Sequence, residues 1–219
     1  MVLERIHWLG HDTFRIDGPL TIYFDPYKLS EGNPKADVIL ISHDHHDHCS
    51  PEDVDKVLGE DTLIVTIATA AERLTGDVPS LSKDNVQVVE PGDVIQVRGV
   101  EVEAVPAYNV DKFRSPGVPF HPREAGHVGF VVTLEGKRIY HAGDTDCIPE
   151  MKNLTEIHIA LLPVSGIYVM TADEAVEAAE AIRPGVAIPM HIGRGIGSLD
   201  AAQVFKEKAP VDVAILEIE

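Results

Sequence analysis

Four side chains that can ligate a metal ion stand within six consecutive positions of the chain. The segment reads His-Asp-His-His-Asp-His, and the four are His43, His45, Asp47 and His48. Imidazole and carboxylate are the donors that zinc and related metal ions prefer. Side chains two apart in an extended segment point to the same side, so His43 and His45 can bind one ion, while Asp47 and His48 can reach a second. We therefore predict a metal site, rather than a histidine-rich loop that picks up metal adventitiously.

The elements that must position this motif can be predicted from the apolar pattern. The motif follows an apolar run at residues 37–42, which predicts a buried strand, and Ser50 followed by Pro51 predicts a helix start directly after it. Further strands are predicted at residues 2–9, 13–16, 20–24, 63–66, 86–90, 94–98, 100–106, 129–134, 138–141, 157–163, 186–190 and 211–217. Helices are predicted from residue 68 to about 74, from 171 to 183 and at 199–208. This pattern indicates sheets covered by helices, an α/β layered fold.

Length and composition limit the classes of protein and partner. The 219 residues fit a single domain, residues 1–219, because no linker-like segment interrupts them. The 18 Lys and Arg against 36 Asp and Glu give a net charge of −18, which argues against nucleic acid and anionic lipid as partners. No apolar run is long enough to cross a membrane, and no signal peptide is recognisable. With only two cysteines, Cys49 and Cys147, these features predict a cytoplasmic protein.

A dinuclear site needs more donors than one loop supplies, and two candidates follow other predicted strands. Asp144 comes directly after the strand at residues 138–141, and we expect it to bridge two ions, with Gly143 letting the backbone approach an ion closely. His191 follows the strand at residues 186–190 and is expected to complete the second ion's donors. Taken singly, Asp144 is equally typical of a turn and His191 of a packed core.

Together these segments resemble the metallo-β-lactamase superfamily. Its His-x-His-x-Asp-His signature is matched at residues 43–48, and Gly143-Asp144-Thr145 and Pro189-Met190-His191 follow in the family's order. Leu9-Gly10-His11 and Asp25-Pro26 resemble the branch that contains ascorbate-6-phosphate lactonase and N-acyl-phosphatidylethanolamine phospholipase. The resemblance implies a four-layer αβ/βα sandwich with two ions at one edge of the paired sheets.

One position departs from the family's pattern. Where the family usually has a further histidine after Pro-Ala, this chain has Asn109. An amide oxygen is a weaker and harder ligand than imidazole, so this position predicts weak binding, a preference for manganese or magnesium, or help from another group. His121, in a predicted long loop at residues 110–126, is the first substitute; His127 is a weaker one because it begins a predicted strand.

Other residues are expected to support the site from behind. Ligating imidazoles normally donate their far N–H to a carboxylate or carbonyl, and Asp25 is the best candidate for that role. His11 and His141 are further candidates, although a packed or surface position explains each equally well. Arg114 and Arg194 could meet an anionic group of a substrate, a role that an exposed arginine does not require.

These residues predict a metal-dependent hydrolase of a small-molecule ester, lactone or phosphodiester. Two divalent ions, zinc first and manganese, nickel or iron as alternatives, would produce a metal-bound hydroxide, which Asp47 would orient as the catalytic residue. Three alternatives stay open: a non-catalytic metal-binding or regulatory module, a nuclease or RNA-processing enzyme, and a di-iron redox protein. The acidic composition opposes the nuclease, and His45 stands where di-iron relatives usually have Glu. The sequence leaves the substrate, the metal and the oligomeric state open.

Overall fold

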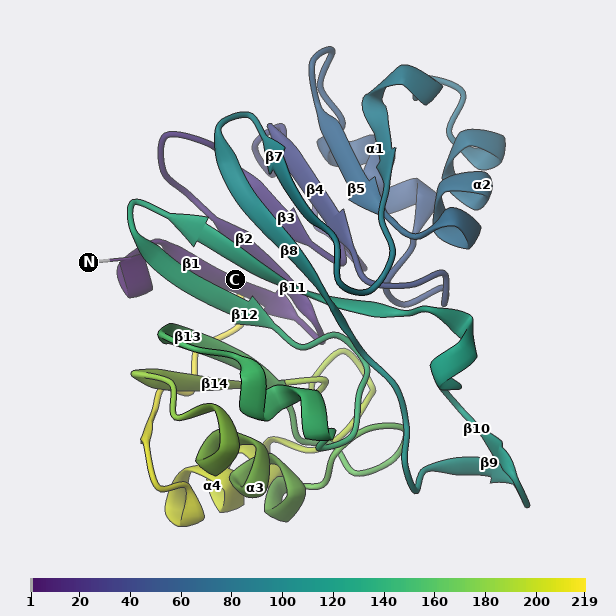
Figure 1. Ribbon diagram of the computed structural model, residues 1–219. Helices are drawn as coiled ribbons and strands as arrows, with labels where there is room; N and C mark the ends of the chain where they lie inside the picture. The colour runs from purple at the N-terminus through teal and green to yellow at the C-terminus, as the bar shows by residue number, and fades with distance from the viewer. Residues whose placement is uncertain (1) are drawn as a thin grey trace.

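The computed structural model describes residues 2–219, and two sheets stacked face to face form its centre (Figure 1). Helices α1 (Pro51–Val57) and α2 (Ala68–Asp77) lie beside the first sheet. Helices α3 (Ala172–Ile182) and α4 (Leu199–Lys208) lie beside the second sheet, on the opposite side of the molecule. The predicted α/β class and αβ/βα sandwich are therefore confirmed.

The first sheet has six strands in chain order. They are β1 (Ile6–Gly10), β2 (Thr13–Ile16), β3 (Ile22–Phe24), β4 (Val38–Ile41), β5 (Leu63–Thr66) and β6 (Val86–Val88). The strands β3 to β6 run parallel, and all four residues of β4 are buried between its neighbours. A strand buried on both faces has to be apolar throughout, which explains the uninterrupted Val-Ile-Leu-Ile run. The segment at residues 43–48 therefore starts from a fixed point at the carboxyl end of β4.

The second sheet has seven strands in the order β15-β14-β13-β12-β11-β8-β7. They are β7 (Val94–Val97), β8 (Val100–Pro106), β11 (Val128–Leu134), β12 (Lys137–His141), β13 (Ile157–Pro163), β14 (Val186–Met190) and β15 (Asp212–Val213). The strands β12 to β15 are parallel, so the carboxyl ends of β12 and β14 meet at one edge. Asp144 and His191 follow these two strands, and ligands commonly bind at such an edge.

Local signals fix where the helices begin. The Ser50 hydroxyl accepts a hydrogen bond from the backbone N–H of Asp53 at the start of α1, followed by Pro51. Thr171 and Glu174 form the predicted capping box at the start of α3. Helix α2 continues three residues beyond the predicted end near residue 74.

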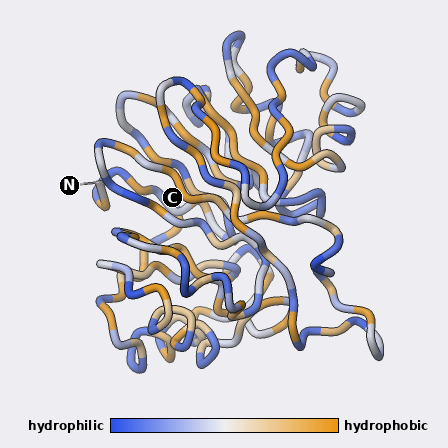
Figure 2. The backbone as a smooth tube through the Cα atoms, viewed as in Figure 1, coloured by the Kyte–Doolittle hydropathy of each residue, from blue (hydrophilic) through white to orange (hydrophobic). Residues whose placement is uncertain are grey.

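Buried apolar side chains of both sheets and of the helices form one contiguous core. Figure 2 shows hydrophobic stretches following the strands of both sheets, with hydrophilic residues concentrated in the connections. The largest buried side chains include Phe14 and Tyr23 from the first sheet and Phe130 and Tyr140 from the second. The expectation of one domain over residues 1–219 stays a prediction, and Met1 lies outside the described residues.

Three predicted elements differ from the structure. The strand predicted at residues 2–9 begins as a 3₁₀ turn, Val2–Arg5, before β1. The C-terminal strand predicted at 211–217 shortens to β15, although the Ile218 backbone forms a single bridge with Trp8 of β1. The loop predicted at 110–126 contains a hairpin of β9 (Phe113–Ser115) and β10 (Val118–Pro119), which projects from the body in Figure 1. Within the described residues, no helix is long and apolar enough to cross a membrane.

Candidate metal centre

Three histidines converge on one point beside the carboxyl end of β4. The ring nitrogens Nε2 of His43 and Nδ1 of His45 lie 3.0 Å apart, and Nε2 of His121 lies 3.2 Å from the same His45 nitrogen. His121 follows the β9–β10 hairpin at its base and is buried. The structure therefore places the proposed substitute histidine beside the first two residues of the motif.

A second group lies next to the first and shares Asp144 with it. The Oδ1 atom of Asp144 is 3.3 Å from Nε2 of His48, and its Oδ2 atom is 3.3 Å from Nε2 of His191. The same Oδ2 atom is 3.1 Å from Nε2 of His121 in the first group. One buried carboxylate thus contacts donors of both groups.

The spacing of these donors suits metal ions. A tetrahedral zinc ion with bonds of about 2.0–2.1 Å holds its donor atoms roughly 3.3 Å apart. Five donor pairs in and between the two groups are separated by 3.0–3.3 Å, and Nε2 of His43 lies 4.0 Å from Oδ2 of Asp144. Among the described residues, Nε2 of His48, Nε2 of His191 and Oδ1 of Asp144 are buried without a hydrogen-bond partner. Such atoms are costly unless a cation or another partner satisfies them, so the donor set fits divalent metal ions.

Contacts behind the ligating atoms fix the histidine tautomers. A carboxylate only accepts, so Nδ1 of His48 donates to Oδ2 of Asp25 at 2.8 Å. The Ser42 hydroxyl donates to the same carboxylate at 2.6 Å and therefore accepts from Nδ1 of His43 at 2.9 Å. With Nδ1 carrying a proton in each ring, Nε2 of both histidines faces the centre as the atom that a metal ion would bind. The Ser165 hydroxyl lies 2.8 Å from Nδ1 of His191 in a similar position.

Asn109 holds His121 and belongs to neither donor group. Its side-chain oxygen accepts hydrogen bonds from the backbone N–H and from Nδ1 of His121, at 2.8 and 3.0 Å. Its amide nitrogen donates to Asp146 and to the backbone oxygen of Tyr168. Asn109 therefore sits behind the histidine that occupies the position the motif lacks.

Asp47 and His11 form a pair at the edge of the two groups. Oδ2 of Asp47 lies 3.4 Å from Nε2 of His11, and His11 is fully buried against the rings of His48 and His191. His141 lies further back, where Nε2 donates to the backbone oxygen of Asp12 and its ring stacks on Phe24.

The backbone around the centre is held in an uncommon conformation. His11, Asp25 and His191 have positive φ angles of 55°, 41° and 59°, in the left-handed region that residues other than glycine rarely adopt. Lys28 and Arg194, which line the pocket described below, have φ angles of 51°. Conformations of this kind cluster where the surrounding structure enforces them, often at functional sites.

Gly143 lies where the two sheets approach each other closely. A Cβ atom there would lie 2.8 Å from the backbone oxygen of Val128 and 3.1 Å from Cβ of Ser42. The glycine therefore allows the loops of the two sheets to approach each other. The predicted close approach of this backbone to an ion stays a prediction.

Burial and neighbouring charges set the protonation states. Burial, with the charge of His48 adding to it, lowers the pKa of His43 well below its ordinary value, which keeps the ring neutral as a ligand requires. Burial alone would raise the pKa of Asp144, but the charges of His191 and His48 outweigh it and hold that pKa well below its usual range. Burial would raise the pKa of Asp47, but the neighbouring His11 and the charge of His48 outweigh it and lower that pKa.

Sequence reasoning missed several residues of this region. Ser42 and Ser165 belong to no recognisable motif. The one available signal was that each lies just after the end of a strand, β4 for Ser42 and β13 for Ser165. Asp12 is fully buried near His48, with 3.8 Å between Oδ2 and Nδ1, and neither of its carboxylate oxygens has a hydrogen-bond partner among the described residues. Its place directly after His11 was the available signal. His127 stacks on His43 but joins neither donor group.

A pocket of about 470 Å³ opens over the centre. His45, Asp47, His121 and Asp144 line it, together with residues of the loops that carry Lys28, Phe120, Tyr168 and Arg194. Catalytic pockets for small molecules have volumes of this order.

Comparison with known proteins identifies the class. A family model described as a beta-lactamase superfamily domain matches residues 5–191. The chain therefore belongs to the metallo-β-lactamase superfamily. It is a metal-dependent hydrolase of that superfamily, as the relatives described next indicate.

The similar proteins extend over most of the chain. A UPF0173 metal-dependent hydrolase of Methanopyrus kandleri is 35% identical over 234 residues, covering 98% of this chain and 96% of that protein. One of Thermoplasma acidophilum is 33% identical over 198 residues, covering 85% and 82%. A solved structure from Parabacteroides distasonis, assigned as a metal-dependent hydrolase, has a TM-score of 0.82 and 33% identity, covering 98% of this chain and 93% of its own.

Proposed function

We propose that the protein hydrolyses a small ester, lactone or phosphodiester at a centre of two divalent metal ions. His43, His45 and His121 would hold one ion, and His48 and His191, with Asp47 at their edge, would hold the other. Asp144 would be a ligand of both ions. The observation that carries the proposal is the position of the Asp144 carboxylate, 3.1 Å from His121 of the first set and 3.3 Å from His191 of the second.

When bound, two divalent ions would supply Lewis acidity. This would lower the pKa of a water molecule towards neutrality and polarise the carbonyl or phosphoryl oxygen of the substrate. The chain's residues provide the orientation. Asp47 lines the pocket as an ionised carboxylate and accepts a hydrogen bond from the attacking water, while His11 fixes the direction of that carboxylate. Asp25 and Ser42 keep His48 and His43 in the ligating tautomer.

Zinc is the metal that this donor set favours first, because imidazole nitrogens and carboxylate oxygens at the observed spacing match its geometry. Manganese, nickel and iron prefer overlapping donors. The histidine at position 121 in place of an amide ligand removes the reason to favour manganese or magnesium that Asn109 gave.

The pocket and the net charge of the chain best support a small molecule as the substrate. The volume of about 470 Å³ suits one small ligand, and the net charge of −18 opposes binding of RNA or DNA. Location in the cytoplasm and membership of the branch with the lactonase and phospholipase stay predictions.

The test begins with metal-stripped protein that is reloaded with zinc or manganese. We expect two ions per chain by plasma emission spectrometry and turnover on a panel of phosphodiester, lactone and thioester substrates. Asp47→Ala should reduce turnover at least a hundredfold while circular dichroism stays unchanged, because it removes a ligand and the group that orients water. Asp44→Ala, in the same loop, is the matched control. Unchanged activity of Asp47→Ala would overturn the assignment, and full loading without turnover would favour a non-catalytic module.

A further inference from the structure

The rim of the pocket carries positive charge, although the chain as a whole has a charge of −18. Lys28 and Arg194 both line the pocket. Among the described residues that line it, the acidic ones are Asp47 and Asp144, which are assigned to the metal centre. The two cations therefore have no acidic partner on the rim, and their field is available to a ligand.

Arg194 is fixed in place by the last two residues of β1. Its Nε and Nη2 atoms donate to the backbone oxygen of Leu9 at 3.2 and 3.1 Å. Its stem lies against Gly10, where a Cβ atom would come within 2.7 Å of the arginine Cγ. Its Nη1 atom makes no hydrogen bond with any residue in the described part of the chain, so a ligand can use it. An arginine held this way loses little entropy when it binds an anion.

Lys28 is tied to the same structure. Its ammonium group donates to the backbone oxygen of Arg194 at 3.0 Å and lies 5.0 Å from the ring centre of Tyr27. The backbone N–H groups of Lys28 and Leu29 donate to the buried Asp53 carboxylate at 2.8 and 2.9 Å. An ammonium has three donors, so Lys28 also keeps hydrogen bonds for a ligand.

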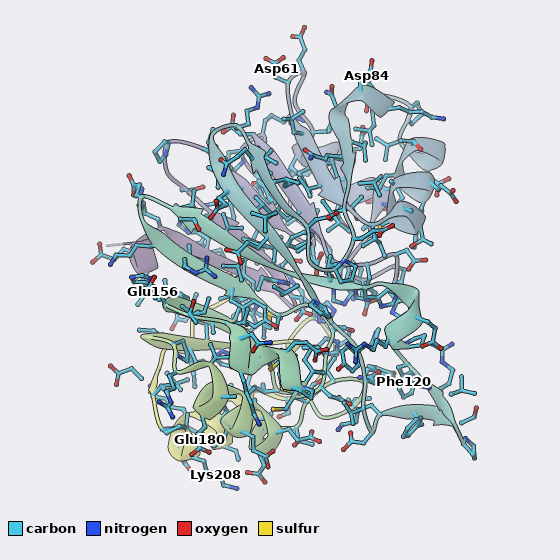
Figure 3. The ribbon with its side chains drawn as sticks, viewed as in Figure 1. Asp61, Asp84, Phe120, Glu156, Glu180 and Lys208 are labelled. Atoms are coloured by element: carbon cyan, nitrogen blue, oxygen red, sulfur yellow. The ribbon has the colours of Figure 1, made fainter. Side chains whose placement is uncertain are left out.

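Apolar surface faces the pocket beside these cations. The rings of Phe120 and Tyr168 both line it and pack edge to face, with centroids 4.9 Å apart. Figure 3 labels Phe120 where the β9–β10 hairpin meets the body of the molecule. The pocket thus combines a metal centre, a cationic rim and an aromatic wall.

We propose that Arg194 and Lys28 bind a separate anionic group, a carboxylate or a phosphate, on a small substrate whose apolar part packs against Phe120 and Tyr168. This inference rests on the proposed function, because it takes the metal centre as the place where the ester or lactone is cleaved. Hydrogen bonds to charged groups are strong enough that losing one from Arg194 should weaken binding about ten- to a hundredfold.

Binding can be measured without turnover by using anilides, which resist hydrolysis. Calorimetry on the metal-loaded protein would compare neutral butyranilide with glutaranilic acid, which carries a carboxylate, and with 4-phosphonobutyranilide, which carries a phosphonate. We expect at least one anion to bind tenfold or more tightly than the neutral compound, and the tighter anion identifies the group. Arg194→Gln should remove most of this advantage, and Lys28→Gln part of it. Lys206→Gln on α4 changes the net charge equally and should retain it.

Equal affinity of the wild-type protein for all three anilides would overturn the inference, as would a full anionic advantage in both Arg194→Gln and Lys28→Gln. Metal content and circular dichroism verify that each variant is folded. If Arg194→Gln does not fold, the comparison is made with Lys28→Gln. For hydrolysis, Arg194→Gln should raise KM about tenfold for mono-4-nitrophenyl glutarate, with kcat unchanged and no effect on 4-nitrophenyl butyrate. A protein that cleaves neither ester but prefers the anionic anilides would refute the proposed function and support the anionic pocket.

Discussion

Replacing Asp25 by Asn tests how far a residue behind the metal centre controls it. The carboxylate accepts from the Ser42 backbone N–H at 2.7 Å, from the Ser42 hydroxyl at 2.6 Å and from Nδ1 of His48 at 2.8 Å. An amide keeps one oxygen, which can stay with the Ser42 N–H, and the hydroxyl can rotate to accept. His48 then faces an NH₂ group and loses its acceptor.

The loss is one hydrogen bond to a charged group, about 1.5–3 kcal/mol. If it acts through the tautomer of His48, zinc affinity should fall about ten- to a hundredfold. Competition with a fluorescent chelator measures that affinity, and urea unfolding of the metal-free protein measures any change in the fold. Asp37→Asn is the matched control, because Asp37 accepts from the backbone N–H of Thr21 at the other end of β4. Zinc affinity within threefold of the wild-type value in Asp25→Asn would refute the reasoning.

Three further changes test separate parts of the structure. His121→Ala should reduce bound metal from two ions to about one by plasma emission spectrometry, and full loading would show that His121 is not a ligand. Burial lowers the pKa of His127 to about 4, so the folded protein keeps this ring neutral while the unfolded chain protonates it below about 6.5. The unfolded state then binds more protons, and stability falls as the pH drops from 6.5 towards 4. Between pH 7 and 5, the free energy of unfolding of metal-free His127→Gln should therefore fall by about 2 kcal/mol less than that of the wild type, as measured by urea titration. Parallel plots of this free energy against pH for the two proteins would contradict the reasoning. Gly143→Ala should destabilise the protein by about 1–3 kcal/mol more than Gly136→Ala, because both have positive φ angles but only Gly143 lacks space for a Cβ atom. Equal unfolding midpoints for these two variants would contradict the close contact with Val128.

The sequence was sufficient to predict the layered fold and the meeting of distant donors, because both depend on regular patterns. The apolar run before His43 indicated a buried strand, and the metal-binding motif at residues 43–48 follows the end of that strand as expected. Asp144 and His191 follow parallel strands of the second sheet, whose carboxyl ends share an edge. Strand direction is thus enough to bring these residues together.

Other features depend on tertiary contacts that no local pattern encodes. The β9–β10 hairpin was predicted as a loop because its strands are only three and two residues long. The segment at residues 110–126 also contains three prolines and two glycines. The relation between Asn109 and His121 depends on a chain reversal across twelve positions, so spacing alone left several readings open. The cationic rim depends on the contact of Arg194 with Leu9, 185 residues earlier in the chain.

The pairing of Asn109 with His121 makes the position of the His121 imidazole independent of the length of the β9–β10 hairpin. The backbone N–H of Asn109 donates to the backbone oxygen of His121 at 2.8 Å, and the Asn109 side chain accepts the N–H of His121 in return. This clasp closes the base of the hairpin, so residues at its tip can be inserted, deleted or exchanged without shifting the imidazole. Evolution could reshape the entrance to the pocket through this arm while the chemistry beneath it stays the same.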